Sequence, residues 1–167
     1  MLSIENHKLF YNAYILPHFD FCCIICGTCN TALDYRLVRF QKRAARLILD
    51  LYCLTPSALL LNTLRWMAFP EWIVYQKALQ MYKTIHCGAP DDLITSFTFT
   101  SEIHTRLLRS VSTCHLYTPR PRHEIFRTSC TCSGASVWSS LPVNIQNASN
   151  VKQFKSLYLR LFKISAT

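Results

Sequence analysis

The sequence has few of the residues that β-rich folds need at their turns. Among its 167 residues there are only three glycines, at positions 27, 88 and 134. Tight hairpins depend on glycine where the backbone turns left-handed, so a β-sandwich or β-barrel is disfavoured. Most of the chain instead places apolar residues at helical spacing, and 50% of its residues are hydrophobic, which is enough to build a core. We therefore expect a mainly α fold.

The sequence also lacks a long uninterrupted apolar run. Its apolar stretches, such as residues 58–61, are interrupted well before the roughly 20 residues that span a bilayer. The N-terminal segment carries Glu5 and has no cationic start ahead of an unbroken apolar stretch, so it does not look like a secretory signal. These absences predict an intracellular protein without a membrane partner, in either the nucleus or the cytoplasm.

Common catalytic motifs are missing as well. The chain has no glycine-rich phosphate loop, no Gly-x-Ser-x-Gly turn and no His-Glu-x-x-His pair, and its six histidines are scattered. Asp91 and Asp92 form an acidic doublet, but they follow Ala89 and Pro90 and do not lie in a hairpin between apolar strands. Helix capping explains this doublet better than a metal pair does. We expect no catalytic residue, no small-molecule substrate and no cofactor in this chain.

Nine cysteines include a candidate metal site at Cys23, Cys26 and Cys29, with Cys22 and His18 nearby. Tetrahedral zinc favours thiolates at such short spacings. A structural zinc site, however, needs a fourth ligand, and here two Cys-x-x-Cys steps overlap instead of forming two separate pairs. Reduced thiols buried as small hydrophobic groups are therefore the favoured interpretation, and zinc is the alternative.

Acidic residues are scarce relative to basic ones. Nine Asp and Glu stand against 18 Lys and Arg, which gives a formal net charge of +9 at pH 7. This excess favours a polyanionic partner such as nucleic acid or an anionic membrane surface. The alternative is a protein that is basic without such a partner.

A predicted helix over residues 31–51 gathers basic residues on one side. At about 100° per residue, its apolar arc consists of Leu33, Leu37, Phe40, Ala44, Leu47, Ile48 and Leu51. The opposite side carries Arg36, Arg39, Lys42, Arg43 and Arg46. An ordinary exposed helix mixes charges of both signs to gain i,i+4 pairs, and this side has no acids. These five cations are the candidate nucleic-acid-binding residues, and a merely solvated face is the alternative.

Local signals predict the remaining elements. Helices are expected over residues 4–16, ended by Pro17, from Thr55 to about residue 64, and from Pro70 to the turn at 87–90. Residues 95–140 lose the helical period and are expected to be irregular, with short strands at 97–100 and 116–126. Asn150 is expected to cap a closing helix. This organisation predicts a helical domain over residues 1–94 and an irregular segment with a C-terminal helix over residues 95–167, or one continuous domain.

Five segments, in chain order, carry a family resemblance: YNAYILPHFDFC, LVRFQKRAARLILD, TPSALLLNTLRWMAFPEW, YTPRPRHEIFRTS and SGASVWSSLP. The most specific parts are the QKRAARLI helix, Thr-Pro-Arg-Pro-Arg at residues 118–122 and Trp-x-x-Leu-Pro at residues 138–142. Together they resemble the C-terminal part of the reverse transcriptases of non-LTR, LINE-type (jockey-like) retrotransposons. The resemblance extends over residues 7–160.

The resemblance implies a helical thumb-like region and the segment after it, downstream of the catalytic palm of an RNA-directed DNA polymerase. The intact polymerase would use magnesium held by palm carboxylates, including a Tyr-x-Asp-Asp motif that this chain lacks. The chain departs from the family pattern at Cys26, Cys130 and Cys132, where aromatic residues are usual. The missing palm portion implies either a degraded or truncated copy of the element or a chain whose upstream polymerase core lies elsewhere, and the departures from the pattern suggest neutral drift in a dead copy.

Two functional hypotheses follow. The first is a non-catalytic fragment of a retrotransposon polymerase that contacts primer-template nucleic acid, an RNA/DNA hybrid or duplex, without sequence preference through the basic helix, since thumb helices grip backbone phosphates. An upstream polymerase core is a further expected partner. The alternative is a small intracellular interaction or structural module that docks a protein through Trp66, Phe69 and Trp72.

Overall fold

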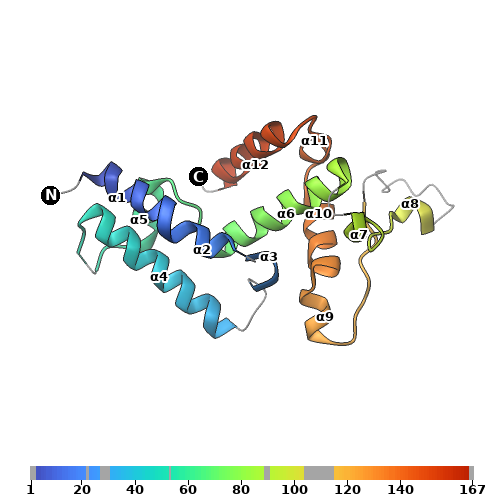
Figure 1. Ribbon diagram of the computed structural model, residues 1–167, viewed down its shortest axis with the longest axis horizontal. Coiled ribbons are helices and arrows are strands. Elements are labelled where there is room, and N and C mark those ends of the chain that lie inside the picture. The colour runs from blue at the N-terminus through green and yellow to red at the C-terminus, as the bar shows by residue number, and fades with distance from the viewer. Residues whose placement is uncertain are drawn as a thin grey trace. The chain divides into compact units, whose positions relative to one another are not determined.

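The computed structural model describes residues 3–21, 23–26, 31–52, 54–88, 91–103 and 115–165, except for a few side chains within the helices. These residues are mainly helical (Figure 1), which confirms the predicted fold class. The elements are α1 (Ile4–Phe10), the π-helical η1 (Tyr11–Ile15), α2 (Leu16–Asp20), α3 (Cys23–Cys26), α4 (Thr31–Leu49), α5 (Ser57–Leu64), α6 (Phe69–Cys87), α7 (Asp91–Ile94), α8 (Thr100–Ile103), α9 (Glu124–Thr128), the π-helical η2 (Cys130–Gly134), α10 (Ala135–Ser140), α11 (Val143–Gln146) and α12 (Val151–Ser165). Within the described part of the chain, no helix has the length and apolar character needed to cross a membrane.

The chain divides into two compact units, one ending at Ile73 and the other beginning at Val74. The division falls within α6, so the first residues of this helix belong to one unit and the remainder to the other. It precedes the domain boundary predicted between residues 94 and 95. One long aromatic helix thus contributes to two separate cores.

The first unit opens with an almost continuous helical run. The Ser3 hydroxyl accepts a hydrogen bond from the Asn6 amide (3.3 Å) and caps α1, and the run continues through η1 and α2 to Asp20. The prediction that Pro17 ends this helix near residue 16 is wrong. Pro17 lies in the first turn of α2, directly after the wider π-helical turn of η1, which accommodates the missing proline amide.

The core of the first unit lies between η1, α4 and α5. Its buried cluster consists of Tyr11, Ala45, Ile48, Leu60 and Leu64. Tyr11 also stacks on Trp66, with the ring centroids 4.2 Å apart. α4 ends directly before Asp50 (φ 51°), and α5 ends directly before Arg65 (φ 56°). Both of these residues have a left-handed backbone conformation. These left-handed turns stop each helix and allow the chain to reverse, so that α5 packs on α4.

The buried Tyr11 phenol makes the fold sensitive to high pH. Burial raises the pKa of Tyr11 to about 12, and the nearby Asp20 carboxylate adds to this rise. An unfolded tyrosine ionises near pH 10, so the stabilisation is complete below about pH 10 and is lost as the pH rises from about 10 to about 12. We expect the Tyr11 contribution to the free energy of unfolding to fall by about 2 to 3 kcal/mol over this range. Urea unfolding at a series of pH values, compared with Tyr11→Phe, measures it; the same alkaline loss in both proteins would contradict the assignment.

Aromatic residues from distant segments form the core of the second unit. Tyr82 of α6 packs on Phe154 of α12 with ring centroids 4.6 Å apart, and its hydroxyl donates to the Ala148 carbonyl (2.6 Å). Trp138 of α10 is 0% exposed, and its carbonyl accepts a hydrogen bond from the buried Gln146 side chain (2.7 Å). The Tyr82 contacts join α6 to α12 and to the segment before it, and the Gln146 bond joins α11 to α10.

The capping prediction for the last helix is confirmed. α12 begins at Val151, and the Asn150 side chain accepts a hydrogen bond from the Gln153 amide (2.8 Å). The Gln153 side chain in turn accepts from the Ser149 amide (2.8 Å). Two amide donors at the start of the helix are thereby satisfied by local side chains.

The prediction of irregular structure over residues 95–140 is wrong for residues 100–103, which form α8, and for its last part. Residues 124–128 and 130–140 are helical, as α9, η2 and α10. Serine, threonine and cysteine conceal the apolar period there, but tertiary burial of Cys132, Ala135 and Trp138 outweighs the weak local propensity. Strands were predicted at residues 97–100 and 116–126. The described residues of these two segments form one isolated antiparallel bridge, between Phe99 and Leu116.

Candidate nucleic-acid interface

A buried glutamine sets the orientation of α4. Gln41 is 9% exposed; its side-chain nitrogen donates to the Met67 carbonyl (2.9 Å) and its oxygen accepts from the Phe69 amide (3.0 Å). Ala45 and Ile48, about one and two turns further along α4, are also buried. Because a buried amide without partners is destabilising, these two bonds fix the side of α4 that faces the interior of the first unit.

The opposite side of α4 is exposed and mixes cations with apolar groups. We define the exposed α4 face as Tyr35, Arg36, Arg39, Phe40, Arg43 and Leu47. Tyr35 is 65% exposed, Phe40 49% and Leu47 79%. The Arg39 guanidinium lies 5.7 Å from the centre of the Tyr35 ring, a distance at which the cation is attracted to the aromatic face. Guanidinium groups and ring faces are therefore offered together on one surface.

The predicted apolar arc of this helix is wrong in its orientation. Among its members Ile48 is buried, Leu37 and Ala44 are half-buried, Phe40, Leu47 and Leu51 are exposed, and the Leu33 side chain lies outside the described residues. The buried side is centred near Gln41 and Ala45, about a quarter of a turn away from the predicted arc. Helical spacing assigned Phe40 and Leu47 to the core because it holds no information about the distant partners of Gln41.

The five predicted cations fall into two groups. Arg36, Arg39 and Arg43 are exposed, whereas Lys42 and Arg46 are half-buried. The Arg46 Nη2 donates to the Thr55 carbonyl (3.3 Å), and its buried Nε has no hydrogen-bond partner among the described residues. Arg46 therefore fastens the segment after α4 to the helix, and the cations open to a ligand are Arg36, Arg39 and Arg43.

The three exposed arginines are not neutralised by ion pairs within the part of the chain that the structure describes. The ion pair found there joins Lys8 to Glu5 at 3.2 Å, in α1. The acidic residue in the first turn of α4, Asp34, is half-buried, outside the exposed α4 face. Unpaired guanidinium groups keep the positive potential that attracts a polyanion.

The aromatic part of this surface was not among the predicted site residues. Tyr35 and Arg39 are separated by four positions, a spacing at which side chains on one helix meet. That pair was therefore visible in the sequence. The exposure of Phe40 was not, because its position on the predicted arc favoured burial.

The zinc alternative lies largely outside what the structure describes. Cys23, at the start of α3, is buried and is not part of a disulfide bond. Cys22 and Cys29 lie outside the described residues, and so does the side chain of Cys26. Of the His, Cys, Asp and Glu side chains that are described, no three are grouped so as to hold a metal ion.

Two cysteines of the second unit, Cys130 and Cys132, are packed as thiols. Cys132 is buried and Cys130 half-buried, and both are free. Burial raises the pKa of the Cys130 thiol, and the positive charge of Lys77 opposes this rise. Burial thus favours the neutral thiol over the thiolate that metal binding requires.

The acidic doublet is part of a helix. Asp91 and Asp92 form the first turn of α7, where negative charge is favourable next to the positive end of the backbone dipoles. The Asp91 side chain lies outside the described residues, and Asp92 belongs to no group of three described His, Cys, Asp or Glu side chains that could hold a metal ion.

The aromatic residues proposed for protein docking are already engaged within the first unit. Phe69 is 5% exposed, and Trp66 is half-buried against Tyr11. The Trp72 indole nitrogen donates to the Asp20 carboxylate (2.7 Å). This cluster stabilises the unit and offers little free surface.

Comparison of the chain with protein-family models, with curated proteins and with solved structures gave no match.

Proposed function

We propose that this chain is a non-catalytic, sequence-nonspecific nucleic-acid-binding fragment of a retrotransposon RNA-directed DNA polymerase, and that it contacts primer-template backbone through the exposed α4 face. The observation that carries the proposal is the exposure of Arg36, Arg39 and Arg43 without an ion-pair partner among the described residues. The resemblance to the C-terminal part of LINE-type reverse transcriptases supports the nature of the ligand. The contact involves no bond making or breaking.

The geometry of α4 suits backbone contact. Positions 36, 39 and 43 are three and four residues apart, so their side chains follow one another along one side of the helix. Guanidinium groups bind phosphate oxygens through paired N–H donors and carry no information about base sequence. An affinity that depends on salt and hardly on sequence is therefore expected.

A salt titration tests the proposal. Binding of the chain to a short RNA/DNA hybrid, followed by fluorescence anisotropy, is expected to weaken with salt at a log–log slope of about −2.7, since each of three neutralised phosphates contributes about −0.9. A hybrid of scrambled sequence serves as the control and is expected to bind equally. A flat salt response, or no binding at low salt, would remove the proposal.

A protein-docking module is the second candidate, and exposed apolar residues favour it. Leu47 is 79% exposed, Tyr52 82% and Leu54 85%, at the end of α4 and in the segment that follows. A surface of this kind fits a polymerase core supplied by an upstream region or a separate chain. Under this alternative, binding of the hybrid alone is absent, so the same titration distinguishes the two candidates.

A further inference from the structure

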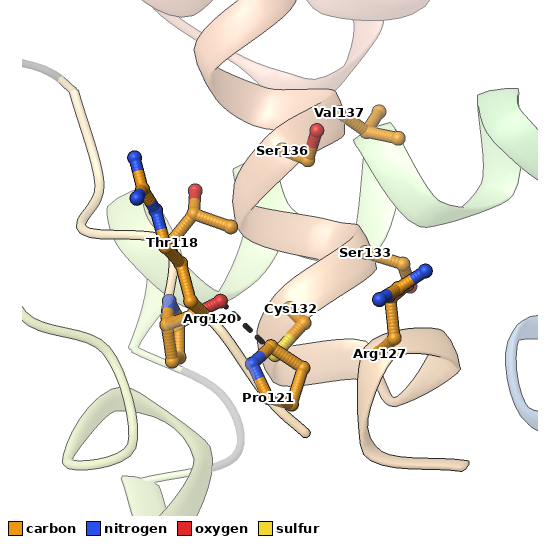
Figure 2. Close-up of a pocket in the computed structure, with 9 residues that line it drawn as sticks. Thr118, Arg120, Pro121, Arg127, Cys132, Ser133, Ser136 and Val137 are labelled. Atoms are coloured by element: carbon orange, nitrogen blue, oxygen red, sulfur yellow. Dashed lines mark hydrogen bonds between the residues drawn. The ribbon is translucent and has the colours of Figure 1, made fainter. Parts of the chain in front are cut away.

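A second candidate binding site lies in the second unit. It is a pocket of about 620 Å³. Its lining consists of Thr118, Pro119, Arg120, Pro121, Arg127, Cys132, Ser133, Ser136 and Val137. Figure 2 shows that the lining comes from the extended segment after Leu116 and from the helical stretch that includes η2 and α10. None of these residues belongs to the exposed α4 face.

The walls of the pocket are fixed by the core of the second unit. The Cys132 thiol is 4.0 Å from the Pro119 carbonyl oxygen, an S–H···O contact that holds the extended segment against η2 (Figure 2). A Cβ at Gly134 would lie 2.8 Å from the Met81 sulfur, so η2 and α6 are in close contact here and a larger residue would require the Met81 side chain to move. Pro119 and Pro121 restrict the backbone of the segment further. The Cys132 contact and the two prolines thus restrain one wall of the pocket.

The lining has the chemistry of an anion site. Arg120 and Arg127 contribute guanidinium groups, and none of the described residues that line the pocket is acidic. In Figure 2 the two arginines lie on opposite sides of Cys132. Behind the lining, the buried Lys77 ammonium donates to the Ser133 hydroxyl (3.2 Å) and adds positive charge.

Other lining groups fit the remainder of an organic ligand. Thr118 and Ser136 are exposed and carry hydroxyl groups that can donate hydrogen bonds. Pro119, Pro121 and Val137 present apolar surface. Pockets that hold small ligands span roughly 300 to 1,000 Å³ and combine apolar walls with a few polar groups. A nucleotide is of this size and has this mixed character.

We infer that this pocket binds an organic phosphate of nucleotide size, with the phosphate held by Arg120 and Arg127 and the less polar part against the prolines and Val137. Guanidinium forks match phosphate oxygens through charge-assisted hydrogen bonds. The ligand is bound and not converted, and the site is independent of the proposed contact through α4. The same nucleoside 5′-phosphate chemistry can come from a free nucleotide or from the 5′-phosphorylated end of a strand.

The first test is calorimetric titration of the full chain with adenosine 5′-monophosphate, adenosine and inorganic phosphate. Adenosine 5′-monophosphate is expected to bind at least tenfold more tightly than either of the other two. Arg120→Gln and Arg127→Gln are each expected to weaken it about tenfold, since each removes one charged hydrogen-bonding group. Arg122→Gln is the matched control, because Arg122 is exposed in the same segment and does not line the pocket. No saturable binding, or an equal loss in the control, would overturn the inference.

Two further variants keep the result interpretable. Ser136→Asp places a negative charge in the pocket from an exposed helical position, and it is expected to abolish binding of adenosine 5′-monophosphate with an unchanged circular dichroism spectrum. Arg39→Glu with Arg43→Glu is expected to leave this binding unchanged, which separates the pocket from the α4 contact. Undiminished binding in Ser136→Asp would overturn the assignment.

A pair of oligonucleotides, one 5′-phosphorylated and one with a 5′-hydroxyl, identifies the source of the phosphate. Tighter binding of the phosphorylated strand that is lost in Arg120→Gln assigns the pocket to a strand end. Equal binding of the two strands, with adenosine 5′-monophosphate still bound, assigns it to a free nucleotide.

Discussion

Reversing the charges of Arg39 and Arg43 together is expected to weaken binding of an RNA/DNA hybrid roughly 100-fold at 0.1 M salt. Each neutralised phosphate contributes almost tenfold at this salt concentration through release of condensed counterions, and the new glutamates also repel the backbone. Both arginines are exposed, so the free energy of unfolding is expected to change by less than about 1 kcal/mol. Anisotropy titrations and urea unfolding measure the two quantities.

The matched control is Lys152→Glu with Lys155→Glu. These lysines are exposed on α12, and their reversal changes the net charge by the same amount. Only a small loss of affinity is expected from this pair. If both double variants lose affinity equally, binding depends on overall charge and the exposed α4 face has no special role. If the Arg39 and Arg43 variant loses stability and binding together, the assignment of this face as solvent-exposed is wrong.

Replacing Trp138 by alanine is expected to lower the free energy of unfolding of the second unit by about 3 to 5 kcal/mol. The side chain is 0% exposed, and the ring centroid of His86, from α6, lies 6.1 Å from its own. Removing the indole creates a cavity that the surrounding aromatic residues fill only in part. Urea unfolding followed by circular dichroism measures the loss.

Leu159→Ala in α12 is the control for this experiment. Leu159 is 42% exposed, so its truncation removes far less buried surface, and a loss below about 1.5 kcal/mol is expected. If Trp138→Ala is no more destabilising than Leu159→Ala, the packing described for the second unit is wrong.

Features with a local cause were predictable from the sequence. Asn150 caps α12 as expected, because the bond from its side chain to the Gln153 amide joins residues three positions apart. The aromatic helix α6 ends at Cys87, directly before Gly88, whose φ of 68° suits glycine. The mainly α fold follows in the same way from periodicity and from the scarcity of glycine.

Features with a distant cause were not predictable. The side of α4 that is buried depends on hydrogen bonds from Gln41 to residues 67 and 69, and no helical period reveals these partners. Helix formation over residues 130–140 depends on burying Trp138 and on the close approach of Gly134 to Met81. The segment itself has weak helical propensity, so its structure is decided by tertiary packing.

The candidate site was therefore predicted in part. The basic helix and three of its exposed cations, Arg36, Arg39 and Arg43, could be read from the sequence. The hydrogen bond from Arg46 to the Thr55 carbonyl could not be predicted from the sequence, because it depends on how the chain turns after Asp50. The same turn determines which residues after α4 remain exposed.

Arginine footprinting tests the central claim most directly. The chain is treated with an arginine-specific dicarbonyl reagent, with and without a saturating RNA/DNA hybrid, and the modified sites are quantified by mass spectrometry. We expect the hybrid to protect Arg36, Arg39 and Arg43 and to leave the exposed Arg65 and Arg160 reactive. Equal protection of all five arginines, or continued reactivity of the three on α4, would contradict the central claim.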